Sequence, residues 1–305
     1  MQADYTQMTS VRCAVCGADD AELVWETPLA EDDHPELGSW FTCTNTHYGR
    51  FGRIVRCNSC GLLYRNPQEV QLLGGYEEAV DPDYLGEWPA RRATFGLSLR
   101  QLARYIRPPG SMLDIGCSAG FSLRAAGEAG WRATGLEPCH WAVQQARSEG
   151  LEVVEGTLEQ HPFSPGSFDV VTIWDVIEHV KDPLDVLRRA FDLVRPGGVI
   201  GLTTMDVESL AARLAGPRWL HMMRMPLCYF GYRHIERLLL EAGFVEPHRH
   251  QHVRVLRSGY LASRLVAAGD GVASAAGRVT QRGLGHLLIP ICLGDLMAVF
   301  ARRPA

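Results

Sequence analysis

The residues with the clearest chemical meaning form a glycine-containing turn at 111–121, Ser-Met-Leu-Asp-Ile-Gly-Cys-Ser-Ala-Gly-Phe. An apolar run ends at Asp114, and Gly116 and Gly120 follow it, which predicts a strand, a tight turn and the start of a helix. Gly116 permits a positive φ in the turn, and Gly120 lets the backbone approach a ligand closely. Free backbone N–H groups at the helix start would face the anionic part of that ligand. The turn therefore predicts a site for a nucleotide-like molecule.

The dinucleotide pattern G-x-G-x-x-G does not fit this turn, because Ser118 and Phe121 stand where its second and third glycines belong. The turn instead resembles motif I of class I S-adenosylmethionine (SAM)-dependent methyltransferases, apolar-apolar-Asp-apolar-Gly-x-Gly-x-Gly. Ser118 replaces the middle glycine of that motif. The resemblance implies that SAM is the co-substrate and that it contacts the turn at Asp114, Gly116, Cys117, Ser118 and Gly120.

An acidic residue, Glu137, lies 21 positions after Gly116, at the end of an expected strand. A carboxylate in this place accepts hydrogen bonds from both ribose hydroxyls of a bound nucleoside, which explains why a spacing of about 20 residues recurs. The alternative is a surface glutamate at a strand end. The resemblance further implies adenine contacts at Thr157 and Leu158, although the family often has an acidic residue where Thr157 stands. It also implies cofactor contacts at Pro138 and Trp174.

Asp175 and His179 follow the nearly continuous apolar run 168–174, where the methyl group of SAM is expected. Methyl transfer from a sulfonium is an in-line displacement, so the protein mainly holds donor and acceptor collinear and dry. A hydroxyl or amine acceptor must also lose a proton. His179 is the candidate general base, with Asp175 as a second catalytic candidate. The alternative is that His179 positions the cofactor loop or caps a helix.

Two further groups could bind metal ions other than zinc. Asp175, Glu178 and His179 resemble the Glu-x-x-Glu-His cluster of ubiquinone-pathway O-methyltransferases, which suits Mg²⁺ or a transition metal, but such a cluster is often structural. Three histidines alternate on the expected strand that begins at 244. They are either a metal site or, more simply, a solvated strand face: His248, His250 and His252.

Four of the nine cysteines form two Cys-x-x-Cys-Gly knuckles. Paired knuckles place four thiolates around one centre, which is the donor set of a closed structural zinc site. Redox dithiols and unpaired core thiols are the alternatives, and Cys43 and His47 lie between the knuckles as possible competitors. We predict one structural zinc ion bound by Cys13, Cys16, Cys57 and Cys60.

Strands and helices must alternate to position these residues. Expected strands lie at 131–136, 151–154, 168–174 and 199–203, with a sixth that begins at 244 and a last one at 294–301 that pairs antiparallel with the sixth. Expected helices lie at 89–106, 120–130, 141–148, 183–194 and 232–242. Such alternation predicts an α/β fold with a doubly wound sheet, whose ligands lie outside the carboxyl ends of the strands. The resemblance implies the seven-stranded, Rossmann-like methyltransferase form of this sheet, preceded by a small β-rich zinc ribbon.

We expect a zinc-ribbon domain and linker at 1–75 and a methyltransferase domain at 76–305, with an acceptor lid around 205–232. Turn signals at 62–88 predict loops between them. Tyr76 and Tyr84 could close over the methionine end of SAM or pack against the ribbon. The lid is rich in methionine and aromatic side chains, which suit an adaptable apolar pocket or a plain core: Trp219, His221, Met222, Met223, Met225, Tyr229 and Phe230.

Composition narrows the function of the 305-residue chain. A net charge of −5 argues mildly against nucleic acid as a partner, and no apolar run reaches the roughly 18 residues of a membrane span. We therefore expect a cytoplasmic enzyme that methylates a small molecule, either a sugar nucleotide or a natural-product intermediate, on oxygen or carbon. An RNA methyltransferase that uses the ribbon to bind nucleic acid and a non-catalytic module of the same fold are the alternatives. The oligomeric state cannot be predicted.

Overall fold

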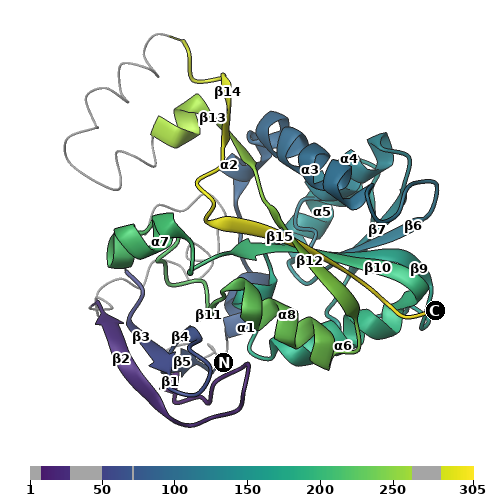
Figure 1. Cartoon of the computed structure of the whole chain (residues 1–305). Coiled ribbons are helices and arrows are strands. Elements are labelled where there is room, and N and C mark those ends of the chain that lie inside the picture. The colour runs from purple at the N-terminus through teal and green to yellow at the C-terminus, as the bar shows by residue number, and fades with distance from the viewer. Residues whose placement is uncertain (1–7, 28–49, 71, 263–282) are drawn as a thin grey trace, which may run out of the picture.

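The computed structural model of the protein describes residues 8–27, 50–70, 72–262 and 283–305 (Figure 1). A seven-stranded sheet runs through its centre in the order β12-β15-β10-β9-β6-β7-β8. The strands from β10 to β8 are parallel, and β15 is antiparallel to both of its neighbours. This order confirms the predicted fold class and the antiparallel last strand. The strands are β6 Ser111–Ile115, β7 Arg132–Glu137, β8 Glu152–Glu155, β9 Phe168–Trp174, β10 Val194–Met205, β12 Val245–Gln251 and β15 Leu296–Arg302.

Helices cover both faces of the sheet, because its central strands are apolar on both sides. In β9, Val170 packs with the first group of helices and Val171 with the second, and both are fully buried. The first group is α3 Trp88–Leu102, α4 Phe121–Glu128 and α5 His140–Ser148, and the second is α6 Pro183–Leu193 and α8 Tyr232–Glu241. The predicted start of α6 is confirmed, since the Asp182 carboxylate accepts from the Asp185 N–H at 2.9 Å and Pro183 is the first helical residue.

The N-terminal residues form a second, antiparallel sheet in the order β11-β4-β3-β2. Its strands are β2 Ala21–Glu26, β3 Arg53–Cys57, β4 Leu63–Arg65 and β11 Cys228–Tyr229. The strand β11 comes from the predicted lid, so the N-terminal sheet is completed by a segment that lies more than 160 residues further along the chain. The division at residue 75 and the lid boundaries stay predictions.

The prediction of loops throughout 62–88 was wrong. The segment contains β4, the two-residue strand β5 Gln68–Glu69, which pairs with β1 Met8–Thr9, and the helices α1 Leu72–Glu77 and α2 Pro82–Leu85. Pro82, one of the turn signals, lies in the first turn of α2, where proline is tolerated and the Asp81 side chain caps the helix. The strand β4 forms because β3 and β11 pair with it, which local propensity does not show.

Smaller elements surround the carboxyl end of the sheet. They are η2 Ile177–His179, α7 Leu210–Ala215, η3 Gly216–Arg218, and the hairpin of β13 Arg254–Arg257 with β14 Leu288–Ile291. The sequence also predicts a helix at 260–276 and a short strand at 40–42, but most of the first and all of the second lie outside the described residues. No helix within the described ranges combines the length and the apolarity that a bilayer crossing requires.

Candidate functional site

The glycine turn between β6 and α4 has the predicted backbone. Gly116 and Gly120 have φ values of +74° and +81°. A Cβ on Gly116 would lie 2.6 Å from Val176 Cγ2, and one on Gly120 would lie 2.4 Å from Leu151 Cδ1, so neither position accepts a side chain without a shift. Ser118 also has a positive φ, +49°, at the position where the methyltransferase motif has glycine.

Asp114 is buried at the end of β6 and points toward its neighbours in the fold. The Thr172 hydroxyl donates to its Oδ1 at 2.7 Å, and the Ser122 hydroxyl donates to its Oδ2. Burial raises the pKa of Asp114 to about 7, although these two hydrogen bonds oppose the shift. The carboxyl group thus connects the end of β6 to β9 and to the first turn of α4, and these hydrogen bonds hold the two ends of the glycine turn in place.

Glu137, at the end of β7, lies beside the same turn. Its Oε2 accepts from the Ser118 N–H at 2.7 Å and its Oε1 accepts from the Cys139 N–H at 2.8 Å. Burial raises the pKa of Glu137 to about 7, while hydrogen bonds from Cys139, Ser118 and the Tyr76 side chain lower it. Glu137, the acidic residue predicted to bind the ribose, therefore faces the glycine turn, and the Tyr76 side chain of α1 is hydrogen-bonded to it.

A narrow pocket opens between the glycine turn and the segment that precedes α3. Ser118 and Cys139, the two donors to Glu137, lie on its wall. Tyr76 and Tyr84 both line this pocket, and the Tyr84 ring stacks on Phe121 with 4.9 Å between the ring centroids. The two tyrosines therefore lie at the glycine turn and not against the ribbon. The lining residues are Tyr76, Ala79, Asp81, Tyr84, Ser118, Cys139, Trp141 and Ala142.

The remaining cofactor candidates lie around this pocket at different depths. Leu158 is buried and belongs to the main core, and Thr157 is half-buried in the loop after β8. That loop is held close by the Gly156 N–H, which donates to the Glu137 backbone oxygen at 3.0 Å. Trp174 is buried in the core between the sheet and α3, and Pro138 is half-buried next to Glu137.

Asp175 occupies the first position after β9 with an unusual φ of +56°. Its Oδ1 accepts from the Thr203 hydroxyl at 2.8 Å, and its Oδ2 pairs with Arg254 Nη2. Burial opposes ionisation, but Arg254, His252 and Thr203 hold the pKa of Asp175 well below its usual range. The carboxylate is thus ionised at neutral pH and paired with an arginine that no motif in the sequence indicates.

Glu178 and His179 point to other partners. Glu178 Oε2 accepts from the Thr204 hydroxyl at 2.9 Å, and burial together with the charge of Asp175 raises its pKa to about 8. Burial lowers the pKa of His179, which also hydrogen-bonds the Met225 backbone. The His179 side chain keeps about 30% of its surface exposed and is neutral near pH 7, as a proton acceptor must be. His179 Nε2 lies 3.9 Å from Glu178 Oε1, but Asp175 is committed to Thr203 and Arg254, so the described geometry does not bring the three ligand atoms together for a metal ion.

Other long-range neighbours complete what we call the mouth cluster, defined as Asp175, His221, His252, Arg254 and Asp295. Asp295 accepts from the Trp219 indole at 2.9 Å and lies 3.8 Å from His221. Burial lowers the pKa of both His221 and His252 to about 4. The idea of one solvated histidine face on β12 was wrong for His252, because the chain turns inward there. No spacing signal identifies Arg254, which lies 79 residues from Asp175 in sequence.

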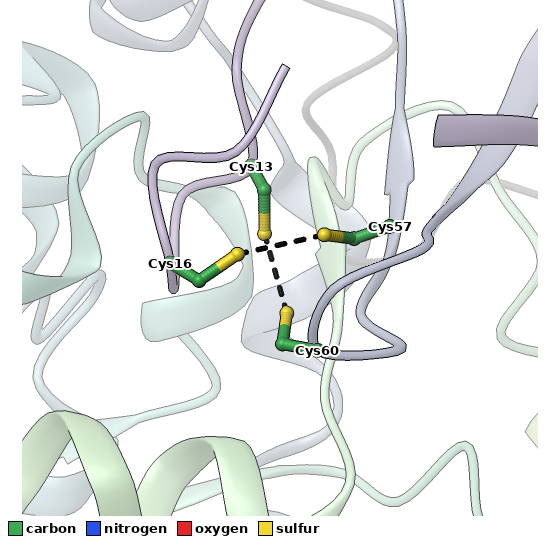
Figure 2. Close-up of side chains that lie close together, drawn as sticks. All are labelled: Cys13, Cys16, Cys57 and Cys60. Carbon is green, nitrogen blue, oxygen red and sulfur yellow. Dashed lines mark hydrogen bonds between the residues drawn. The ribbon is translucent and has the colours of Figure 1, made fainter. Parts of the chain in front are cut away.

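The four knuckle cysteines meet as predicted (Figure 2). Their four Sγ atoms all lie within 4.8 Å of one another, and two of the Sγ–Sγ distances are 3.5 Å. Zinc–sulfur bonds of about 2.3 Å in a tetrahedron place sulfurs roughly 3.8 Å apart, so the arrangement fits this ion. Burial raises the pKa of Cys13, whereas backbone N–H groups of Cys60 and Ser59 outweigh burial at Cys57 and lower its pKa to about 7. Cys43 and His47 lie outside the described residues.

Comparisons with known proteins agree on one family. A family model described as a methyltransferase domain matches residues 89–246, just over half of the chain. The ubiquinone biosynthesis O-methyltransferase of Xanthomonas campestris pv. campestris (strain B100) is 33% identical over 120 residues, which are 37% of this chain and 50% of that protein. The Sodalis glossinidius protein of the same name is 30% identical over 172 residues, 52% of this chain and 68% of that protein. The chain thus spans about half the length of curated relatives such as the Xanthomonas protein.

Solved structures with similar folds share little sequence with this chain. A possible histamine N-methyltransferase from Thermotoga maritima has a TM-score of 0.49 and 20% identity, covering 72% of this chain and 95% of that one. Phosphoethanolamine N-methyltransferase 2 from Haemonchus contortus, solved with S-adenosyl-L-methionine, has a TM-score of 0.48 and 17% identity, covering 87% of this chain and 67% of that one.

Proposed function

Because the chain belongs to the family described as a methyltransferase domain, we propose that it is a SAM-dependent methyltransferase that transfers the methyl group of SAM to an oxygen atom of a small molecule. The observation that carries the proposal is the position of Glu137, held against the glycine turn by the Ser118 N–H at 2.7 Å. The names of the relatives support oxygen as the methylated atom. They give no support to a sugar nucleotide as acceptor.

We place the nucleoside of SAM along the carboxyl ends of β6, β7 and β8. Ribose hydroxyls would donate to Glu137 in the place where the Tyr76 side chain now bonds. The backbone N–H groups of Ala119 and Phe121 would face the methionine carboxylate at the start of α4, because those of Ser118 and Gly120 already donate to Glu137 and to the Cys117 backbone oxygen. In this proposal Asp114 holds the turn in shape. The further candidate contacts are Gly116, Cys117, Gly120, Pro138, Thr157, Leu158 and Trp174.

The methyl group would then emerge beside Asp175 and Val176, since Val176 packs against Gly116. The mouth cluster on one side and His179 on the other border this position, which makes it the expected acceptor site. His179 remains the candidate base for an acceptor hydroxyl that arrives protonated, because it is neutral and partly exposed.

We also propose that the four knuckle cysteines hold one structural zinc ion. The distances between their sulfur atoms and the all-thiolate donor set support zinc over harder cations. A ribbon used only for nucleic acid would not need to share a sheet with the lid, whereas β11 pairs directly with β4. The ribbon would therefore support the lid.

Isothermal calorimetry with SAM tests the cofactor site, and transfer of a labelled methyl group to a panel of phenols and aliphatic alcohols tests the reaction. We expect SAM to bind with micromolar affinity and at least one phenol to be methylated on oxygen. Failure to bind SAM would refute the proposed placement of the cofactor. Product methylated only on carbon or nitrogen would refute oxygen as the acceptor atom.

A further inference from the structure

We propose that Arg254 binds the acceptor as an oxyanion, so that the acceptor is a phenol or another acidic hydroxyl compound. The inference rests on the proposed O-methyl transfer, and it adds the chemical class of the acceptor and the residue that recognises it. It concerns the one cation of the mouth cluster, whose role neither the sequence motifs nor the fold explains.

Arg254 lies where the acceptor must approach. It begins β13, and its Nη2 pairs with Asp175 at the carboxyl end of β9. The next residue, Val176, lies against the glycine turn, with its Cγ2 only 2.6 Å from where a Cβ of Gly116 would be. The guanidinium therefore contacts Asp175, whose neighbour Val176 contacts the turn that is proposed to hold SAM.

The guanidinium has a donor left over. Its Nε is buried and finds no hydrogen-bond partner among the described residues, whereas its Nη2 is committed to Asp175. The side chain as a whole retains about 23% of its surface, so it borders an accessible space. A buried donor on a cation is costly without an acceptor, and an anionic oxygen gives the strongest bond to it.

Asp175 is built to hold Arg254 rather than to react. Its φ of +56° turns the residue out of the strand direction, and Thr203 fixes its other oxygen at 2.8 Å. Backbone strain of this kind persists where the surroundings enforce it and is common at ligand sites. Asp175 is thus a positioning residue for the arginine.

The charges around the mouth are balanced until SAM binds. Arg91 from α3 acts on Asp175, and Asp295 before β15 acts on His221, which also faces Arg254 and Asp175; the two cations Arg91 and Arg254 thus oppose two carboxylates. Glu178, His221 and His252 are uncharged near pH 7. The sulfonium of bound SAM adds one positive charge. An oxyanion neutralises it, and a neutral alcohol does not.

For an acceptor acidic enough to lose its proton to bulk solvent as it binds, the reaction needs no base in the site, and His179 is left for acceptors that stay protonated. The neighbouring guanidinium widens the first class, because it lowers the pKa of a phenol. A lone pair of the oxyanion forms the new O–CH₃ bond, the S–CH₃ bond breaks, and its electron pair stays on sulfur as a neutral thioether. Opposite charges disappear in this step, which a site that excludes water favours.

The experiment uses 4-nitrophenol as the probe, since its ionised form is yellow. The protein is loaded with S-adenosylhomocysteine, which allows no turnover, and the bound probe is titrated by absorbance. We expect wild-type protein to lower the pKa of the bound probe by about one unit, a tenfold preference for the phenolate. Arg254→Met should abolish this shift and Arg254→Lys should keep part of it.

The matched control is Arg195→Met. Arg195 pairs with Asp169 at 2.6 Å at the opposite end of β9, so this variant also breaks an arginine–aspartate pair but should leave the shift unchanged. If Arg254→Met does not fold, the double variant Asp175→Asn/Arg254→Gln removes both charges and leaves neither one unpaired.

Two results would overturn the inference. One is a wild-type protein that does not bind the probe or does not lower its pKa, and the other is an equal shift in the variants without a cation at 254. Calorimetry with SAM separates this failure from that of the proposed function. If SAM still binds and aliphatic alcohols are methylated, only the role of Arg254 falls.

Discussion

The Ser118 N–H donates to Glu137 Oε2 at 2.7 Å, and this hydrogen bond joins the ends of two neighbouring parallel strands. The carboxylate proposed to hold the ribose therefore also shapes the turn proposed to hold the rest of SAM. Removing its charge should affect both tasks at once.

Glu137→Gln should weaken SAM binding at least tenfold in calorimetry, because an amide offers one acceptor oxygen to donors that now use two. Glu155→Gln is the matched control, since Glu155 ends the adjacent strand β8 but is exposed and pairs with His140 at 3.0 Å. Equal SAM affinity in both variants would contradict the placement of the ribose.

Gly116→Ala should abolish SAM binding and lower the melting temperature. The new Cβ would meet Val176 at 2.6 Å in a backbone with φ of +74°, so both the turn and the mouth must shift. In Gly127→Ala, within α4, the added Cβ meets nothing within 4 Å. That control should keep SAM affinity and gain up to about 1 kcal/mol of stability. A Gly116→Ala protein with normal SAM affinity would show that the turn does not hold the cofactor.

His179→Ala tests the base. For a phenol that is neutral at the assay pH, we expect turnover to fall by about 10²–10⁴-fold. The turnover of a phenol that is already ionised at that pH should change little in this variant, because this phenol has lost its proton before it binds. His248→Ala, on the exposed part of β12, should change neither rate. Full turnover of the neutral phenol by His179→Ala would remove the base role.

The buried acid Glu178 predicts a loss of stability in alkali. Burial, with repulsion from Asp175, raises its pKa to about 8, whereas an unfolded glutamate titrates near 4.3. Its stabilising contribution is fully present below about pH 4 and is lost as the pH rises through about 8. Between pH 7 and 9 the free energy of unfolding should fall by about 1 kcal/mol. In urea unfolding, the free energy of Glu178→Gln should fall less between pH 7 and 9 than that of the wild type. An equal fall in the two proteins would show that Glu178 is not the group that titrates.

Cys60→Ser tests the zinc site and its link to the lid. Elemental analysis should give one zinc per wild-type chain and much less in the variant. Because the Arg65 N–H donates to the Leu227 backbone oxygen at 2.9 Å beside β11, methyl transfer should fall several-fold while SAM affinity stays within about twofold. The exposed Cys292→Ser is the control and should keep both the metal and the rate. Metal-free wild-type protein would end the zinc proposal.

Local signals predicted the sheet and the glycine turn well. The run Phe168–Trp174 is a strand over its whole predicted length, and Gly116 and Gly120 take the positive φ that their spacing indicated. These features depend on residues close together in the chain. The four cysteines were also predictable, because each pair sits within one turn and the donor chemistry requires the other pair.

The mouth cluster could not be predicted, because its members come from four separated segments. Arg254 opens a short strand whose partner β14 starts more than thirty residues later, and His252 looked like a member of a polar strand face. The pairing of β11 with β4 depends likewise on contacts between distant parts of the chain. Such relationships carry no periodicity in the sequence.

The sheet shared by β4 and β11 limits how the protein can be shortened. A polypeptide that starts at residue 89, where the family match begins, would lose β4 and leave the backbone of Cys228 and Tyr229 as an open edge. Open edges of apolar strands recruit other chains and promote aggregation. Expression of the catalytic half alone should therefore yield insoluble protein. An exchange of the ribbon between relatives would likewise require that β11 be exchanged together with the ribbon.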